Sequence, residues 1–412
     1  MSTRLAITPL LAAILLSAAV SSALFQSPAV ADAASPAVQS GAADVKALIS
    51  QLGDEKFAVR KSAGEKLAKI GLPAFQALEE ATRDCDREIR YRAEKVLSVI
   101  RQNDLNRRLT IFLASLDSPE DKSLPSWPRF KAAHGNTANT RSLFVEMQRA
   151  EGELLAQLDA DPRQATDLLG KRALALAQEQ NRLNREGAWL PLGQIAAVFF
   201  VASEPDVKPT SNTVSLLLQL GTQQSLLGIG SPGEAVEKLT VEKAALSRKL
   251  LGTLIARAED SATTEAVRLA MIYSLKEGLG PALKLLDAPP RGRLYMPYMQ
   301  YALLVVAKFG DDSHLSAVEK LFTENTLIAT TSSRGVRREV QVRDSALAAA
   351  VLLTKQQLKD YFELPENLAA QQQGGALPSS TLSIGFENDE QRTAAFAKWG
   401  AFKAKQAAEP KK

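Results

Sequence analysis

The chain has 412 residues, enough for two or three ordinary domains or for one extended repeat array. Hydrophobic residues make up 45% and charged residues 23%, as in globular proteins, and a lone cysteine, Cys85, excludes an intramolecular disulfide. With 50 Lys and Arg against 46 Asp and Glu, the net charge is only +4, which does not favour nucleic acid as the partner.

Residues 1–31 are predicted to be a signal peptide. Arg4 supplies a positive start, the next 21 residues carry no charge, and two A-x-A cleavage patterns follow at residues 29–33. The alternative is an uncleaved N-terminal anchor, because 21 uncharged residues just suffice to cross a bilayer. Cleavage predicts an exported, periplasmic or extracellular protein that does not contact the membrane, with residues 32–43 as a linker.

Residues 44–103 contain an internal repeat with a period of thirty residues, which is typical of helical repeat arrays. Residues with the same character recur as the pairs Leu48 and Leu78, Asp54 and Asp84, Val59 and Ile89, Arg60 and Arg90, Ala63 and Ala93, Leu67 and Leu97, and Ile70 and Ile100. The apolar members after the aspartate fall on one stripe of a helix, which must be buried. A shorter apolar helix and a Gly-Asp turn precede that stripe, so each unit is predicted to be a helical hairpin.

These residues resemble the HEAT and HEAT-like repeat family, in which a turn aspartate stands six residues before an arginine that follows a β-branched residue. The resemblance implies an α-solenoid whose concave face is lined by the second helix of each hairpin. It also implies that Asp54, Arg60, Asp84 and Arg90 form a hydrogen-bonded ladder between hairpins rather than a catalytic group.

The resemblance returns near the C-terminus. Residues 104–290 are predicted to be helices of irregular length, and residues 291–370 to be further HEAT-like hairpins in which Arg343 occupies the ladder position. The stretch 326–342 is rich in Thr, Val and Ile, which indicates a short β-hairpin or an ordered loop. The chain as a whole also resembles exported bacterial HEAT-repeat proteins of unassigned function, through the segments Trp127-Pro128-Arg129-Phe130, Leu143-Phe144-Val145-Glu146-Met147 and Gln341-Val342-Arg343-Asp344.

Residues 371–387 are predicted to be a linker, and residues 388–406 a helix that caps the array through Phe396, Trp399 and Phe402. The predicted fold class is therefore all-α: an α-solenoid of HEAT-like hairpins with irregular central helices and a small β-hairpin insertion.

No catalytic, cofactor or metal site is predicted. The two histidines, His134 and His314, lie far apart in the sequence, and Cys85 stands among acidic residues without a histidine nearby. A G-x-G-x-x-G pattern at residues 228–233 lacks the preceding strand and the βαβ unit of a dinucleotide site.

The leading functional hypothesis is a monomeric, non-catalytic protein-binding or scaffold protein of the cell envelope or periplasm, whose partner is another protein. An accessory or lyase-like HEAT-repeat enzyme and a purely structural envelope component are the alternatives. The candidate partner-binding residues are Lys61, Tyr91, Arg92 and Lys95 on the second helices and Arg334, Arg337 and Arg338 in the late loop.

Overall fold

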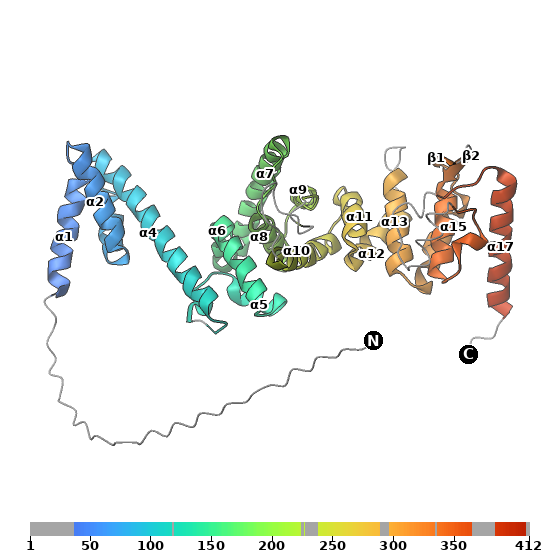
Figure 1. Ribbon diagram of the computed structural model, residues 1–412, viewed down its shortest axis with the longest axis horizontal. Helices are drawn as coiled ribbons and strands as arrows, with labels where there is room; N and C mark the ends of the chain where they lie inside the picture. Colours follow the sequence, from blue (N-terminus) through green and yellow to red (C-terminus); the bar gives the residue numbers. More distant parts are fainter. Residues whose placement is uncertain are drawn as a thin grey trace, which may run out of the picture. The chain divides into compact units, whose positions relative to one another are not determined.

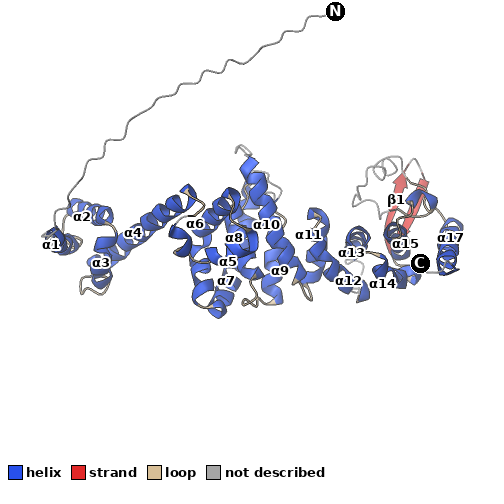
Figure 2. Ribbon diagram, turned by 90° about the horizontal axis from the view of Figure 1, so that it is seen from below, coloured by secondary structure: helices blue, strands red, loops and turns tan. Residues whose placement is uncertain are grey.

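The computed structural model describes residues 37–117, 119–223, 226, 238–288, 296–333, 336–364 and 384–408. Within these residues the fold is all-α apart from one two-stranded antiparallel sheet (Figures 1 and 2). The chain divides into two compact units, Met1–Asp104 and Leu105–Lys412. The predicted signal peptide lies outside the described residues. No helix in the described part of the chain has the length and apolarity needed to cross a membrane.

The first unit contains α1 (Ala37–Gln51), α2 (Phe57–Ile70), α3 (Phe75–Ala81) and the start of α4 (Arg87–Ala114). The prediction of a linker at residues 32–43 is wrong from Ala37 onward, because α1 already begins there. Alanine is the best helix former, and α1 contains three alanines after Ala37 and no proline. Short polar turns join α1 to α2 and α3 to α4.

The stripe predicted from the thirty-residue period forms the core of the first unit. Ala63, Leu67, Ala93 and Leu97 are at most 3% exposed. The two hairpins also approach each other closely at Gly53, where an added Cβ would lie 2.9 Å from the Asp86 carboxylate and from the Ile89 side chain. Only glycine fits such a contact, so the turn of one hairpin packs directly on its copy.

An arginine closes the turn of the first hairpin. Arg60 Nη1 donates to the backbone carbonyls of Asp54 and Glu55, at 2.7 and 2.8 Å. The Asp54 carboxylate does not bind this guanidinium and instead accepts from the backbone N–H of Lys56 at 2.8 Å. The Arg60 guanidinium therefore satisfies carbonyls of the turn, and the Asp54 carboxylate satisfies an N–H group. Both kinds of backbone group lack partners where one helix ends and the next begins.

The second hairpin repeats this geometry thirty residues later. Arg90 Nη1 donates to the carbonyls of Asp84 and Cys85 at 2.6 and 3.0 Å, and the Asp84 carboxylate accepts from the N–H of Asp86 at 2.8 Å. The predicted ladder is therefore wrong in its partners: each arginine binds turn carbonyls of its own hairpin, and each aspartate caps the backbone. The charged side-chain contact of Arg60 between the hairpins is its Nε ion pair with Glu88 Oε1, at 3.3 Å.

This geometry sets the expected cost of Arg60→Ala. The substitution leaves the Asp54 and Glu55 carbonyls without their donor but strands no buried carboxylate, so the free energy of unfolding should fall by about 1–2 kcal/mol. Arg101 provides the control, since its side chain is 60% exposed and its carboxylate partner Glu79 is 3.8 Å away. Arg101→Ala should cost at most about 0.5 kcal/mol in the same urea titration. Equal losses would contradict a turn-closing role for Arg60.

The second unit is built around one continuous hydrophobic core that extends from Leu109 to Trp399. The predicted central region, late hairpins and C-terminal helix are thus parts of one packed body. Its elements are α5 (Trp127–His134), α6 (Ala138–Ala160), α7 (Pro162–Glu186), α8 (Leu192–Ser203), α9 (Ser211–Leu220), α10 (Lys238–Ala256), α11 (Ala262–Tyr273), α12 (Leu279–Asp287), α13 (Met296–Phe309), α14 (Leu315–Glu319), β1 (Leu327–Ser333), β2 (Val336–Gln341), α15 (Val342–Leu353) and α17 (Asp389–Ala408).

The N-terminal part of this core is aromatic. Phe112 and Trp127 meet edge to face with ring centroids 4.8 Å apart, and Phe130 and Phe144 lie 5.4 Å apart beside them. Arg141 is buried against this cluster, with its guanidinium 3.6 Å from the centroid of the Phe112 ring. A buried cation needs partners for its N–H groups, and the guanidinium of Arg141 finds them in the Phe112 carbonyl and the Asp121 carboxylate.

The sheet predicted at residues 326–342 is present as the antiparallel pair β1–β2. Its residue Glu339 also pairs with Phe386, and an added Cβ on Gly385 would lie 2.1 Å from the Glu339 carbonyl oxygen. The predicted linker 371–387 is therefore wrong at its end, because residues 384–387 pack against the sheet. Its remaining residues, 371–383, lie outside the described residues.

The C-terminal helix α17 docks on the rest of the second unit (Figure 1). The Asn388 side chain caps it by accepting from the N–H of Gln391 at 2.9 Å, as its sequence indicates. Trp399 is 4% exposed, and its indole N–H donates to Glu319 Oε1 at 3.0 Å. The ring of Phe396 meets that of Phe322 edge to face at 5.2 Å, so the aromatic face predicted from the sequence does pack inward.

Candidate functional site

The outer face of α2 and α4 in the first unit carries large apolar side chains that the core does not use. Phe57 is 63% exposed and Tyr91 is 51% exposed. Both lie off the buried stripe of their helices, so packing gives no reason for an aromatic side chain at either position. We call Phe57, Lys61, Tyr91, Arg92 and Lys95 the aromatic–cation face.

Two of the predicted cations on this face are accessible. Lys61 is exposed and reaches Glu65 only at 3.8 Å, an exposed ion pair of low strength. Lys95 is exposed and places its ammonium 4.5 Å from the centroid of the Tyr91 ring. This cation–π contact holds the ring and the charge together while leaving the ammonium hydrated.

Arg92, the third predicted cation, is mostly buried and is paired with a carboxylate of its own helix. Its Nε donates to Glu88 at 2.6 Å, and its side chain is 21% exposed. Both Arg92 and Arg60 lie 5.9 Å from the centroid of the Phe57 ring, so this phenylalanine sits between two guanidinium groups. The sequence analysis did not single out Phe57; the signal that identifies it is an aromatic residue off the stripe of an amphipathic helix.

The second predicted surface, the loop at 326–342, is only partly available to a partner. Arg337 has a side chain that is 70% exposed. Arg338 is 16% exposed and forms ion pairs with Glu363 and Glu387 at 3.0 and 2.7 Å, so little of its side chain is open to a partner. Its role is to fasten β2 to the segment before α17. Arg334 lies outside the described residues.

Arg343 does not take the ladder role predicted for it. Its Nε donates to Gln341 Oε1 at 2.7 Å, and no turn carbonyl of the described residues accepts from its guanidinium. The neighbouring Asp344 carries the structural contact instead, through hydrogen bonds to Arg392 at 2.9 and 3.2 Å. Sequence reasoning missed this pair because 48 residues separate its members.

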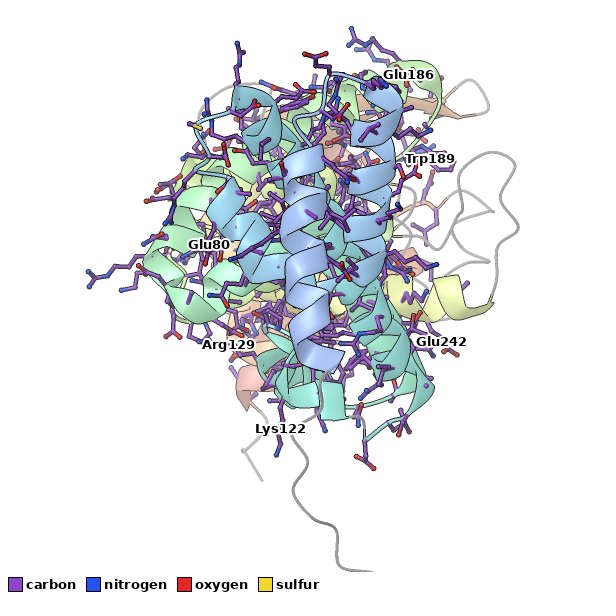
Figure 3. All side chains as sticks on the ribbon, turned by 90° about the vertical axis from the view of Figure 1, so that its left-hand side faces the viewer. Glu80, Lys122, Arg129, Glu186, Trp189 and Glu242 are labelled. Atoms are coloured by element: carbon purple, nitrogen blue, oxygen red, sulfur yellow. The ribbon has the colours of Figure 1, made fainter. Side chains whose placement is uncertain are left out.

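Arg129, in one of the segments that carried the family resemblance, forms a charged cluster in the second unit (labelled in Figure 3). Its guanidinium lies 3.0 Å from Glu204, 3.2 Å from Asp206 and 3.3 Å from Asp159. The hydrogen bond that Arg129 donates to the Glu204 carboxylate raises the pKa of Arg129 above its ordinary value. The cluster sets one cation against three carboxylates, and it ties α5 to the ends of α6 and α8.

Candidate metal ligands are not brought together in the described residues. No three His, Cys, Asp or Glu side chains there are arranged as metal ligands. Burial, with the nearby charge of Lys249, lowers the pKa of His134 to about 4, and its ring packs on Phe130 with centroids 4.8 Å apart. Cys85 is exposed in the second turn. The G-x-G-x-x-G pattern at residues 228–233 lies outside the described residues.

A groove of about 610 Å³ lies between α1 and α2. None of the residues that line it belongs to the aromatic–cation face. Ala47, Leu48 and Ile70 supply its apolar lining, and Lys66 and Lys69 supply cations. Nothing in the described residues indicates what would cover it.

Comparisons with protein-family models, with curated proteins and with solved structures found no match. The aromatic–cation face is therefore the candidate site on physical grounds alone, and the HEAT-like assignment stays a prediction.

Proposed function

We propose that this protein is a non-catalytic protein-binding or scaffold protein of the cell envelope, exported through its N-terminal signal and acting as a monomer. The observation that carries the proposal is the aromatic–cation face, where Phe57 and Tyr91 are more than half exposed among Lys61, Arg92 and Lys95. Tyrosine and arginine are enriched among the residues that dominate binding energy in protein interfaces, and exposed aromatic side chains favour burial against a partner.

A HEAT-like solenoid is the architecture we propose for presenting this face. Two features support it: the thirty-residue period, and the arginine that closes the turn of each hairpin in the same way. The second helices α2 and α4 also approach each other, since an added Cβ on Gly64 would lie 3.6 Å from Val96. Neighbouring second helices form one surface that can contact an extended segment of a partner.

Capture from envelope extract tests the proposal. The variant Lys61→Glu with Tyr91→Ala should lose at least about 90% of the captured partner, because it reverses one charge and removes the central aromatic anchor. Its circular dichroism and melting temperature should match those of the wild type, since both side chains are exposed.

The matched control is Lys66→Glu with Leu72→Ala, which changes one exposed lysine and one exposed apolar residue elsewhere in the unit. This control should keep wild-type capture. Undiminished capture by the folded Lys61→Glu, Tyr91→Ala variant would contradict the proposed interface.

A further inference from the structure

One stripe of α4 combines an aromatic side chain with two uncompensated cations. Arg87, Tyr91 and Lys95 recur at i, i+4 and i+8, which places them on one side of the helix. All three are exposed. Among the described residues, no carboxylate lies at ion-pair distance from Arg87 or from Lys95. We call these three residues the α4 stripe.

The fold gains nothing evident from Arg87. It is the first residue of α4, where the helix dipole disfavours a cation by about 0.3–1 kcal/mol. By contrast, Arg60 and Arg90 close turns, and Arg92 pairs with Glu88. The cations of the α4 stripe are thus positive charges that the protein leaves open to an external anion.

The spacing of the stripe constrains the shape of that anion. A helix rises about 1.5 Å per residue, so the Cα atoms of Arg87 and Lys95 stand about 12 Å apart along the axis, with that of Tyr91 midway. An extended peptide advances about 3.3 Å per residue and would cover 12 Å in about four residues. Carboxylates at positions i and i+4 would then face the two cations, and an apolar side chain at i+2 would face Tyr91.

We propose that the α4 stripe binds an extended acidic peptide segment of the form acidic-x-apolar-x-acidic. The inference rests on the proposed function and specifies the partner chemically. A nucleic-acid strand fits less well, because Lys95 already occupies one face of the Tyr91 ring, on which a base would stack.

Fluorescence anisotropy with the full chain and labelled synthetic peptides tests the inference. The peptide Gly-Glu-Ser-Leu-Ser-Glu-Gly should bind, and its analogue with both glutamates replaced by lysine should not. The variant Arg87→Glu with Lys95→Glu should bind the acidic peptide on the order of 10-fold more weakly or worse, because each contact becomes a repulsion. Raising the salt from 50 to 500 mM should weaken wild-type binding by a similar factor, since the contacts are exposed.

The control variant is Lys66→Glu with Lys69→Glu, which makes the same charge change at the groove between α1 and α2. It should bind within about twofold of the wild type, so that net charge alone is excluded as the cause. Equal binding of the two peptides, equal loss in the two variants, or tighter binding of oligothymidine would overturn the inference. If capture from extract depends on Tyr91 while the acidic peptide does not bind, only this inference fails and the proposed function stands.

Discussion

Replacing Arg392 with methionine is expected to lower the free energy of unfolding of the second unit by about 3–5 kcal/mol, because it leaves a buried carboxylate without its partner. The Asp344 side chain is 0% exposed and the Arg392 side chain 6% exposed, with Nε and Oδ1 2.9 Å apart. Burial raises the pKa of Asp344, and the hydrogen bond and charge of Arg392 act against that rise. The pair joins the first turn of α15 to the first turn of α17.

Urea unfolding followed by the fluorescence of the tryptophans, which include Trp399 of α17, would measure this loss. The double variant Arg392→Met, Asp344→Asn should recover a substantial part of it, since removing both charges avoids the stranded carboxylate. Arg337→Met is the control, because that side chain is 70% exposed and should contribute at most about 0.5 kcal/mol. Similar losses for Arg392→Met and Arg337→Met would show that the buried pair does not hold α17.

Arg141→Met is expected to have the second large effect: it should lower the free energy of unfolding of the second unit by about 3–4 kcal/mol. The Arg141 side chain is 1% exposed and binds Asp121 at 2.6 Å. It also donates to the Phe112 carbonyl from Nε and Nη2, at 3.0 and 2.6 Å, and to the Leu116 carbonyl at 3.1 Å. Burial raises the pKa of Asp121, but hydrogen bonds, chiefly from Arg141, outweigh it and hold that pKa below its usual value.

Arg141→Lys separates charge from shape in this site. An ammonium keeps the charge but cannot reach the carboxylate and both carbonyls together. Arg141→Lys should therefore lose most of the free energy of unfolding that Arg141→Met loses. Arg182→Met serves as the comparison, because its side chain is 53% exposed and its carboxylate partner Glu186 is 54% exposed. Its cost should stay near 1 kcal/mol. Full stability of Arg141→Lys would mean that charge alone is needed there.

The sequence predicts well what depends on local periodicity. The stripe through Ala63 and Leu67 and its copy through Ala93 and Leu97 is buried because a repeated spacing can be converted directly into one helix face. The sheet at 326–342 and the aromatic face of α17 followed from composition and capping in the same way. Lys61, Tyr91 and Lys95 are exposed for the same reason, because they lie off the stripe.

Contacts between distant residues were not predictable in this way. Asp344 meets Arg392, and Arg338 meets Glu387, across 48 and 49 residues of chain, and no local pattern marks either partner. The error over Arg60 has another cause: a guanidinium can donate to carbonyls as well as to carboxylates, and sequence does not show which oxygen faces it.

Photo-crosslinking in the native cell tests the binding role of the aromatic–cation face most directly. A photoreactive phenylalanine analogue would replace Tyr91 in one variant and Glu80, an exposed residue of α3 labelled in Figure 3, in another. Irradiation should yield a discrete adduct with an envelope protein from position 91, absent from position 80 and lost when Arg87→Glu and Lys95→Glu are added. No adduct from position 91, or the same adduct from both positions, would contradict a partner bound at this face.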